Sequence, residues 1–239
     1  MNILLIASLI LIAYVILQYI YSNNYLKIGR KLAETKYQTT AVLGNKNNPP
    51  LKLFITGDSV GAGVGADSFD TSLSGRTANY LAEKYFVSFK NESISGSKMG
   101  DLLNMPRPSE KQDIIVLVIS SNDLFRFTDL KQFKKDTKSV IEMYQPLAKK
   151  IIILGPGRVF DAEAIPVPLR IIYKIMSSKY TNIISSEISH YNNIVQVDLT
   201  KTPPSKAKYG KSISASDQFH PDNIGHSFWF DSIKPQLNF

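Results

Sequence analysis

The sequence predicts a single α/β domain built in three layers, with a central parallel sheet covered by helices on both faces. Runs that are almost entirely apolar, such as residues 113–119, are typical of strands buried on both faces, and helical patterns separate these runs. The first strand ends in Gly57-Asp58-Ser59, at the position where doubly wound sheets keep their ligand sites. With 239 residues and 44% apolar content, the chain can bury one substantial core.

The expected elements alternate along the chain once a polar stretch ends in Pro49-Pro50. The expected strands cover residues 51–56, 86–92, 113–119, 150–154 and 194–199. The expected helices cover residues 72–85, 131–147, 169–191 with an interruption, and 223–233. We therefore divide the chain into a membrane anchor over 1–22, a juxtamembrane segment and linker over 23–50, and the folded domain over 51–239.

The anchor is predicted from residues 3–21, an apolar run interrupted only by Ser8 and Gln18. Nineteen helical residues reach about 28 Å, close to a hydrocarbon core of about 30 Å. A cleaved signal peptide would show a basic leader, a shorter apolar run and a small-residue cleavage site, and these signals are absent from the sequence. A buried helix of a soluble protein is the third alternative. We expect a single-pass membrane protein.

Basic residues follow this run, at Lys27, Arg30, Lys31 and Lys36. The positive-inside rule then favours a cytoplasmic location for the folded domain, and an outward-facing domain stays open as the alternative. The formal net charge is +8, and we expect the basic flank to attract anionic lipid headgroups. A solvated lysine-rich surface explains the charge equally well. Nucleic acid is not an expected partner, because no basic block alternates with aromatic residues.

The glycine-rich turn after the first strand matches three patterns. Residues 61–66 fit the dinucleotide fingerprint G-x-G-x-x-A, but three residues separate them from the strand, so we expect no cofactor. Gly57-x-Ser59-x-Gly61 fits the α/β-hydrolase elbow, but only one strand precedes it. The third pattern includes Gly96, Asn122-Asp123 and Asp217-x-x-His220, each near an expected strand or loop end.

Taken together, Gly57-Asp58-Ser59, Gly96, Asn122-Asp123 and Asp217-x-x-His220 resemble the GDSL, or SGNH, hydrolase family. The resemblance extends over residues 51–237 and implies a flavodoxin-like fold and a serine esterase or lipase. Within the family, the chain looks like a branch with an amino-terminal apolar membrane helix. It departs at Ser120, where the family usually has Gly. Ser120 could narrow the substrate site or simply pack.

The chemistry of each residue follows from what a serine nucleophile needs. His220 would take the proton from Ser59, and Asp217 would hold the other ring nitrogen and stabilise the imidazolium. The resemblance assigns the oxyanion hole to the backbone N–H groups of Ser59 and Gly96 and to the amide of Asn122. Gly57, Asp58 and Asp123 are expected to support the turn and the strand end.

Other polar residues are expected to be structural, including His190 and His226. With three histidines and no cysteine, we predict no metal site. Residues 164–176 form an apolar segment that either packs in the core or lines an acyl site. Three functions stay open: acyl-ester hydrolysis, for example of lysophospholipids or short acyl esters; acetyl transfer or removal on a glycan, or thioester cleavage; and a non-catalytic binding module. The oligomeric state is not predicted.

Overall fold

The computed structural model describes residues 3–35, 37–201 and 213–238. Within these residues, six strands form one sheet in the order β1-β3-β2-β4-β5-β6. All neighbours are parallel except β1, which pairs antiparallel with β3 at the edge. The strands are β1 (Thr40–Leu43), β2 (Pro50–Gly57), β3 (Phe86–Asn91), β4 (Gln112–Val118), β5 (Ala148–Leu154) and β6 (Ile194–Val197). The predicted α/β class with a central, largely parallel sheet is confirmed.

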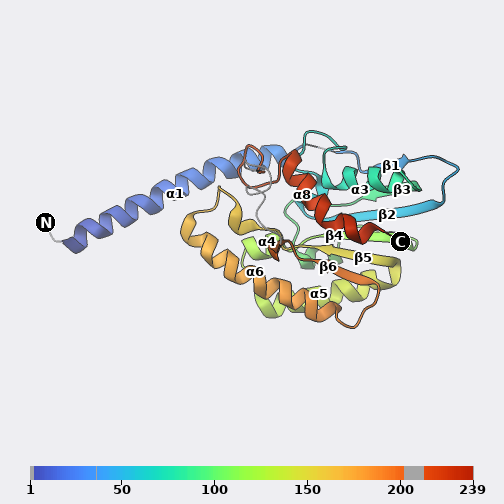
Figure 1. The fold of residues 1–239 in the computed structure, drawn as a ribbon. Helices are drawn as coiled ribbons and strands as arrows, with labels where there is room; N and C mark the ends of the chain where they lie inside the picture. Colours follow the sequence, from blue (N-terminus) through green and yellow to red (C-terminus); the bar gives the residue numbers. More distant parts are fainter. Residues whose placement is uncertain (1–2, 36, 202–212, 239) are drawn as a thin grey trace.

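The sheet separates two apolar layers, because successive side chains of a strand point to opposite faces. Leu53 and Ile55 face α3 (Leu73–Ala82) and α8 (Asn223–Ile233). Phe54 faces the other way, into the core formed with α5 (Leu130–Tyr144) and α6 (Val167–Ile188). Figure 1 shows these helix pairs above and below the sheet. The shorter elements are α2 (Ser59–Ala62), α4 (Ser121–Phe125) and the 3-10 turns η1 (Met99–Leu103), η2 (Gln145–Leu147), η3 (Val159–Asp161), η4 (Leu199–Lys201) and η5 (Lys234–Leu237).

Side-chain caps explain where three of the long helices begin. Ser72 accepts from the N–H of Gly75 at the start of α3, Asp129 accepts from two N–H groups at the start of α5, and Asp222 does the same for α8. Such caps satisfy amide groups that have no partner within the helix. Helix α6 has no side-chain cap but carries Pro in its first turn, a favoured position. The interruption expected in this helix is absent.

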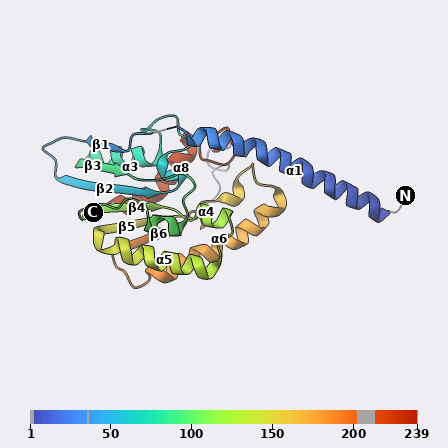
Figure 2. The ribbon, with the colours of Figure 1, turned by 180° about the vertical axis from the view of Figure 1, so that it is seen from behind.

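The amino-terminal region differs from the sequence prediction. Residues 3–33 form one continuous helix, α1 (Ile3–Ala33), so the expected boundary at residue 22 lies inside a helix. Figures 1 and 2 show that its first half projects away from the domain. A search of the described residues for a helix long and apolar enough to cross a membrane finds none. The predicted transmembrane span is therefore not supported.

The predicted linker also contains structure, because β1 lies within residues 23–50 and pairs with β3. Only alternate residues of β1 are partly buried, and a strand of four residues offers too short a pattern to detect. Between α1 and β1, the Tyr37 hydroxyl donates to the backbone oxygen of Ala66 at 2.6 Å. The chain that leaves α1 is thus fixed to the glycine-rich turn after β2.

Candidate active site

Ser59 lies at the carboxyl end of β2, where the strand passes into α2. Gly57 makes this turn possible: its φ is 145°, and a Cβ there would lie 1.9 Å from the backbone oxygen of Val118. That oxygen instead accepts the N–H of Asp58 at 2.7 Å. The Asp58 carboxylate accepts from the N–H of Val60 at 3.0 Å and so caps α2. Ser59 is therefore the first residue of a capped turn at the edge of the sheet.

Ser59, His220 and Asp217 form one chain of hydrogen bonds. Nε2 of His220 lies 3.0 Å from Oγ of Ser59, and Nδ1 lies 2.5 Å from Oδ2 of Asp217. The other carboxylate oxygen, Oδ1, accepts the backbone N–H groups of Phe219 and His220 at 3.1 and 3.0 Å. The ring is thus held at both nitrogens, and the structure brings Ser59 together with Asp217 and His220, which lie 158 and 161 positions further along the chain.

The charge of Asp217 is maintained by its partners. Burial alone would raise the pKa of this carboxyl, but the hydrogen bond and charge of His220 and the two backbone N–H groups outweigh burial and lower the pKa. Asp217 is therefore ionised at neutral pH and accepts from Nδ1–H. With the proton on Nδ1, Nε2 presents a lone pair to Ser59.

The residues expected around an oxyanion lie in one cleft with Ser59. Gly96 has a φ of 87°, and the turn it occupies is closed by a bond from the N–H of Ser97 to Ile94. The Asn122 amide donates to the backbone oxygen of Ser97 at 3.1 Å. An amide nitrogen carries two donors, so this bond leaves a second N–H for the cleft. Gly96, Asn122 and Ser59 all line this cleft.

Ser120 has an unusual backbone conformation, which explains why glycine is usual at this position. Its φ is 82°, in the left-handed region, which glycine adopts without steric cost. Its side chain is fully buried, and its hydroxyl has no hydrogen-bond partner. Ser120 packs beneath the site and does not line either of the clefts described below.

Two further carboxyl groups are buried next to these residues. Burial raises the pKa of Asp58 to about 7 and the pKa of Asp123 to about 6. One oxygen of Asp123 accepts the N–H of Met99 at 2.7 Å, which joins the end of β4 to the Gly96 region. His226 is structural: Nδ1 accepts from Leu73 N–H, Nε2 lies 3.1 Å from Val64 O, and burial lowers its pKa to about 4.

Two clefts meet at Ser59 and His220. The first has a volume of about 580 Å³ and is mostly apolar; α1 and the start of α6 form its walls. The second has a volume of about 460 Å³, and its lining includes charged groups. Besides Asp58, these groups are Arg158, Asp161, Glu163 and Arg170. An ester bound at Ser59 therefore has an apolar space on one side and a more polar space on the other.

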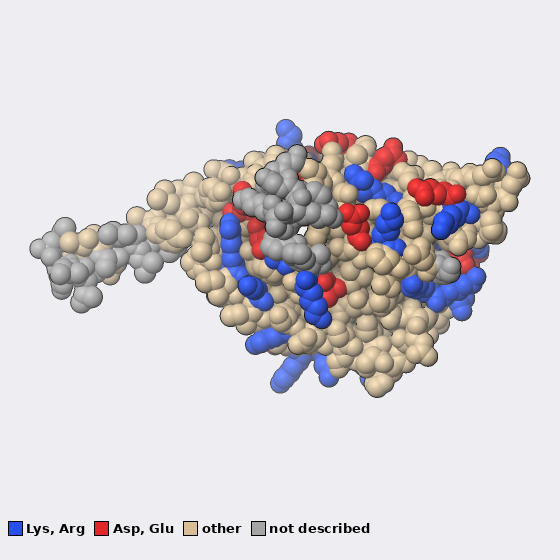
Figure 3. Space-filling view, viewed as in Figure 1, with Lys and Arg blue, Asp and Glu red and all other residues tan. Residues whose placement is uncertain are grey.

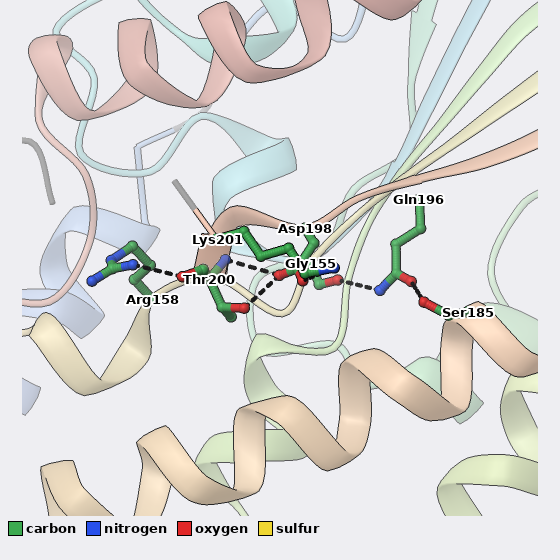
Figure 4. Close-up of polar contacts among 7 residues, drawn as sticks. All are labelled: Gly155, Arg158, Ser185, Gln196, Asp198, Thr200 and Lys201. Carbon is green, nitrogen blue, oxygen red and sulfur yellow. Dashed lines mark hydrogen bonds and ion pairs between the residues drawn. The ribbon is translucent and has the colours of Figure 1, made fainter. Parts of the chain in front are cut away.

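One wall of the polar cleft is tied to the end of the sheet by the network in Figure 4. Arg158 donates to the backbone oxygen of Thr200 at 2.9 Å, and Thr200 donates to Asp198 through both its N–H and its hydroxyl. Gln196 donates to the backbone oxygen of Gly155 at 3.2 Å. The loop after β5 is thus joined to the segment after β6.

The sequence analysis missed the part that α1 contributes to the site. Gly29 is buried against Asp217: a Cβ at Gly29 would lie 2.8 Å from Oδ2. The hydroxyl of Ser22 donates to the backbone oxygen of Ala164, ahead of α6, at 3.1 Å. A glycine inside a helical pattern usually has a packing or functional reason, and Gly29 was the available signal.

Comparison with known proteins identifies the family. The model of the GDSL-like lipase/acylhydrolase family matches residues 55–228. The chain belongs to this family. It is accordingly a carboxylic ester hydrolase. The search of curated proteins finds no match.

Solved structures of low identity share the fold of this GDSL-family chain. A catalytic mutant of an acetylxylan esterase from Geobacillus stearothermophilus is 21% identical, with a TM-score of 0.57, over 82% of this chain and 97% of that one. A protein from Streptococcus pneumonia, provisionally described as a platelet activating factor, is 18% identical, with a TM-score of 0.57, over 98% of this chain and 99% of that one. The second match is long enough to include most of α1.

The surface charge of this GDSL-family protein is mixed. On the face in Figure 3, basic and acidic side chains are interspersed over the folded domain. The sequence has no charged residue before Lys27. Among the described residues, no group of three or more His, Cys, Asp or Glu side chains could hold a metal ion.

Proposed function

We propose that the protein hydrolyses acyl esters through a covalent acyl-enzyme on Ser59. The observation that carries this proposal is the bonded chain from Ser59 through His220 to Asp217. Oγ of Ser59 attacks the carbonyl carbon while Nε2 of His220 takes its proton. The tetrahedral intermediate then breaks its bond to the alcohol oxygen, which receives that proton from His220. Water repeats the two steps on the acyl-enzyme, releasing the acid and restoring Ser59.

The remaining residues stabilise charge that develops during these steps. Asp217 stabilises the imidazolium that His220 becomes. The N–H groups of Ser59 and Gly96 and the Asn122 amide donate to the oxyanion of the intermediate. One donor of this kind typically contributes about 3–4 kcal/mol to transition-state stabilisation. Asp58 and Asp123 act indirectly, because each fixes a turn that carries one of the donors.

Hydrolysis of p-nitrophenyl esters, from acetate to palmitate, tests the proposal with the full chain. Ser59→Ala should abolish both turnover and labelling by a fluorophosphonate probe, which reacts with activated serines. Ser59 is small and buried, so we expect Ser59→Ala to keep the fold of the protein, and a thermal melt of the variant checks this. Turnover that survives Ser59→Ala refutes the mechanism.

Removal of acetyl groups from a glycan is a second candidate. Several structural neighbours are described as acetylxylan or acetyl-xylooligosaccharide esterases, and the charged lining of the polar cleft is compatible with a hydroxyl-rich alcohol. A thioester would use the same machinery. A preference for acetate over longer acyl chains would favour this candidate over an ester of a lipid.

We also propose that the first half of α1 contacts membrane lipids. The support is a set of exposed apolar side chains on a segment without charge, followed by the exposed basic residues Lys27, Arg30 and Lys31. The exposed apolar residues include Leu5, Leu9, Ile12, Ile16, Leu17 and Ile20. Flotation of the full chain with anionic vesicles tests this, and Leu9→Asp combined with Ile16→Asp should reduce the bound fraction. Equal binding by this variant would contradict lipid contact through α1.

A further inference from the structure

We propose that α1 is one wall of the active site, and that the acyl chain of the substrate lies in the apolar cleft between α1 and α6. This inference rests on the proposed esterase function and names the substrate class that the site accepts, an ester with a long acyl chain. The family match covers residues 55–228, so α1 lies outside the part of the chain that defines the family.

One face of α1 lines the cleft along most of the length of its second half. Its lining residues recur every three or four positions, as residues on one side of a helix do. They are Tyr14, Gln18, Ser22, Tyr25, Leu26, Gly29, Arg30 and Ala33. The opposite wall includes Pro168, Leu169 and Tyr173 of α6. The cleft therefore continues from the catalytic residues along the groove between two helices.

The contacts of α1 fix it against the catalytic residues. Gly29 packs directly on the Asp217 carboxylate, where the absence of a side chain allows the close approach. Ser22 is bonded to Ala164 ahead of α6, and Tyr37 is bonded to Ala66 beyond the carboxyl end of α1. These three contacts hold α1 and the chain that follows it in place beside the groove.

The groove is long enough for a whole acyl chain. From Gly29, beside Asp217, to Tyr14 the helix rises about 22 Å, at about 1.5 Å per residue. One leaflet of a bilayer, which holds one acyl chain along its depth, is about 15 Å thick in its hydrocarbon part. The cleft volume of about 580 Å³ is within the range of small-molecule sites.

The outer end of the groove opens onto apolar surface. Helix α6 exposes a set of large apolar side chains in its first turns, and the neighbouring part of α1 exposes others. The α6 set is Val167, Leu169, Ile171, Ile172 and Ile175. An exposed apolar patch of this kind marks an interaction site. A lipid ester can therefore enter from an aggregate with its chain in contact mostly with apolar side chains.

The second cleft suits the other half of the ester. It shares Ser59 and His220 with the groove, whose lining is mostly apolar although it includes Arg30 and Arg126. The second cleft is more polar and is lined by Arg158, Asp161 and Glu163. Burying an alkyl chain there would leave these charged groups without water, which is costly. The acyl chain therefore belongs in the α1–α6 groove and the polar alcohol in the second cleft.

The test uses the full chain and compares kcat/KM for p-nitrophenyl dodecanoate with kcat/KM for p-nitrophenyl acetate. Leu26→Trp on α1 and Leu169→Trp on α6 fill the groove from opposite walls. Each should lower the dodecanoate-to-acetate ratio about tenfold or more. Two matched controls, Ile28→Trp on α1 and Ile171→Trp on α6, alter residues that do not line the groove and should keep the wild-type ratio.

Three results would overturn the inference. The first is a wild-type ratio in both groove variants, because the chain then does not occupy the groove. The second is a wild-type enzyme that hydrolyses acetate but not dodecanoate esters. The third is a larger loss with dodecyl acetate than with dodecanoate esters, because the alcohol chain would then lie there. Failure of the proposed function looks different, since the wild type would hydrolyse neither ester in a Ser59-dependent way.

Discussion

The contact between Gly29 and Asp217 predicts that a single methyl group on α1 impairs catalysis. In Gly29→Ala, the new Cβ would lie 2.8 Å from Oδ2 of Asp217, where an ordinary contact begins at 3.4 Å. The carboxylate cannot move freely, because it is held by the His220 ring and by two backbone N–H groups. Either Asp217 or α1 must shift by about 0.6 Å to remove the overlap.

The expected loss of rate follows from the size of this shift. A misplacement of 1 Å near reacting groups can cost about 100-fold in rate, so about half that shift should cost about tenfold. A tenfold loss in kcat/KM corresponds to about 1.4 kcal/mol in transition-state stabilisation. The free energy of unfolding should not fall by a similar amount, because Ala is favoured over Gly in a helix by about 1 kcal/mol.

The assay is kcat/KM for p-nitrophenyl acetate together with the melting temperature of each variant. Asn24→Ala is the matched control, because it also improves helix propensity but changes an exposed residue of the same helix. We expect Asn24→Ala to keep wild-type activity while Gly29→Ala loses about tenfold. Wild-type activity in Gly29→Ala, with the chain folded, would show that α1 does not lie against Asp217.

Three other residues carry further predictions. Ser120→Gly should raise the free energy of unfolding, measured with urea, by about 1 kcal/mol. It removes a side chain from a residue with left-handed backbone conformation, and it removes a buried hydroxyl that has no hydrogen-bond partner. Asn122→Ala should lower kcat by about 10²–10³ with a smaller change in KM, measured by steady-state kinetics, because it removes an oxyanion donor. His226 is held neutral with a pKa of about 4, so the free energy of unfolding should fall as pH drops from about 6.5 towards 4, because the unfolded chain takes up a proton that the folded chain resists. His226→Asn should show less of this pH dependence in urea unfolding at pH 5 and 7.

Each of these predictions has a result that contradicts it. Ser120→Ala removes the hydroxyl but keeps a Cβ on the left-handed backbone. Equal increases in the free energy of unfolding for Ser120→Ala and Ser120→Gly would therefore show that the backbone conformation costs nothing. An unchanged kcat in Asn122→Ala would exclude its amide from the oxyanion hole. An undiminished pH dependence in His226→Asn would place the responsible proton on another group.

The parts of the fold that were predictable are those governed by local pattern. The apolar run at 113–119 became β4 with a shift of one residue, and residues 223–233 form α8 as predicted. The proposed catalytic residues were predicted partly from local pattern and partly from the family resemblance. A strand end places Ser59, and one short turn places both Asp217 and His220, but that the two segments meet was predicted only from the resemblance to the GDSL, or SGNH, family.

The part played by α1 was not predictable from its sequence. Residues 3–21 are so uniformly apolar that composition outweighed any facial pattern, and the periodic residues that line the cleft begin only near Tyr14. The contact between Gly29 and Asp217 joins positions far apart in the chain, and a lone glycine in a helix does not indicate its partner. Only the folded chain shows which carboxylate the glycine accommodates.

Ser120 shows how a local departure can be detected without its meaning being clear. The sequence showed Ser at a position where the family usually has Gly, and both a role in the substrate site and plain packing were compatible with that observation. The backbone decides between them: with φ at 82° and the side chain fully buried, the position favours glycine for conformational reasons. The serine therefore affects the stability of the turn that carries Asn122 more directly than the choice of substrate, and Ser120→Gly should raise stability while leaving the ratio of dodecanoate to acetate hydrolysis unchanged.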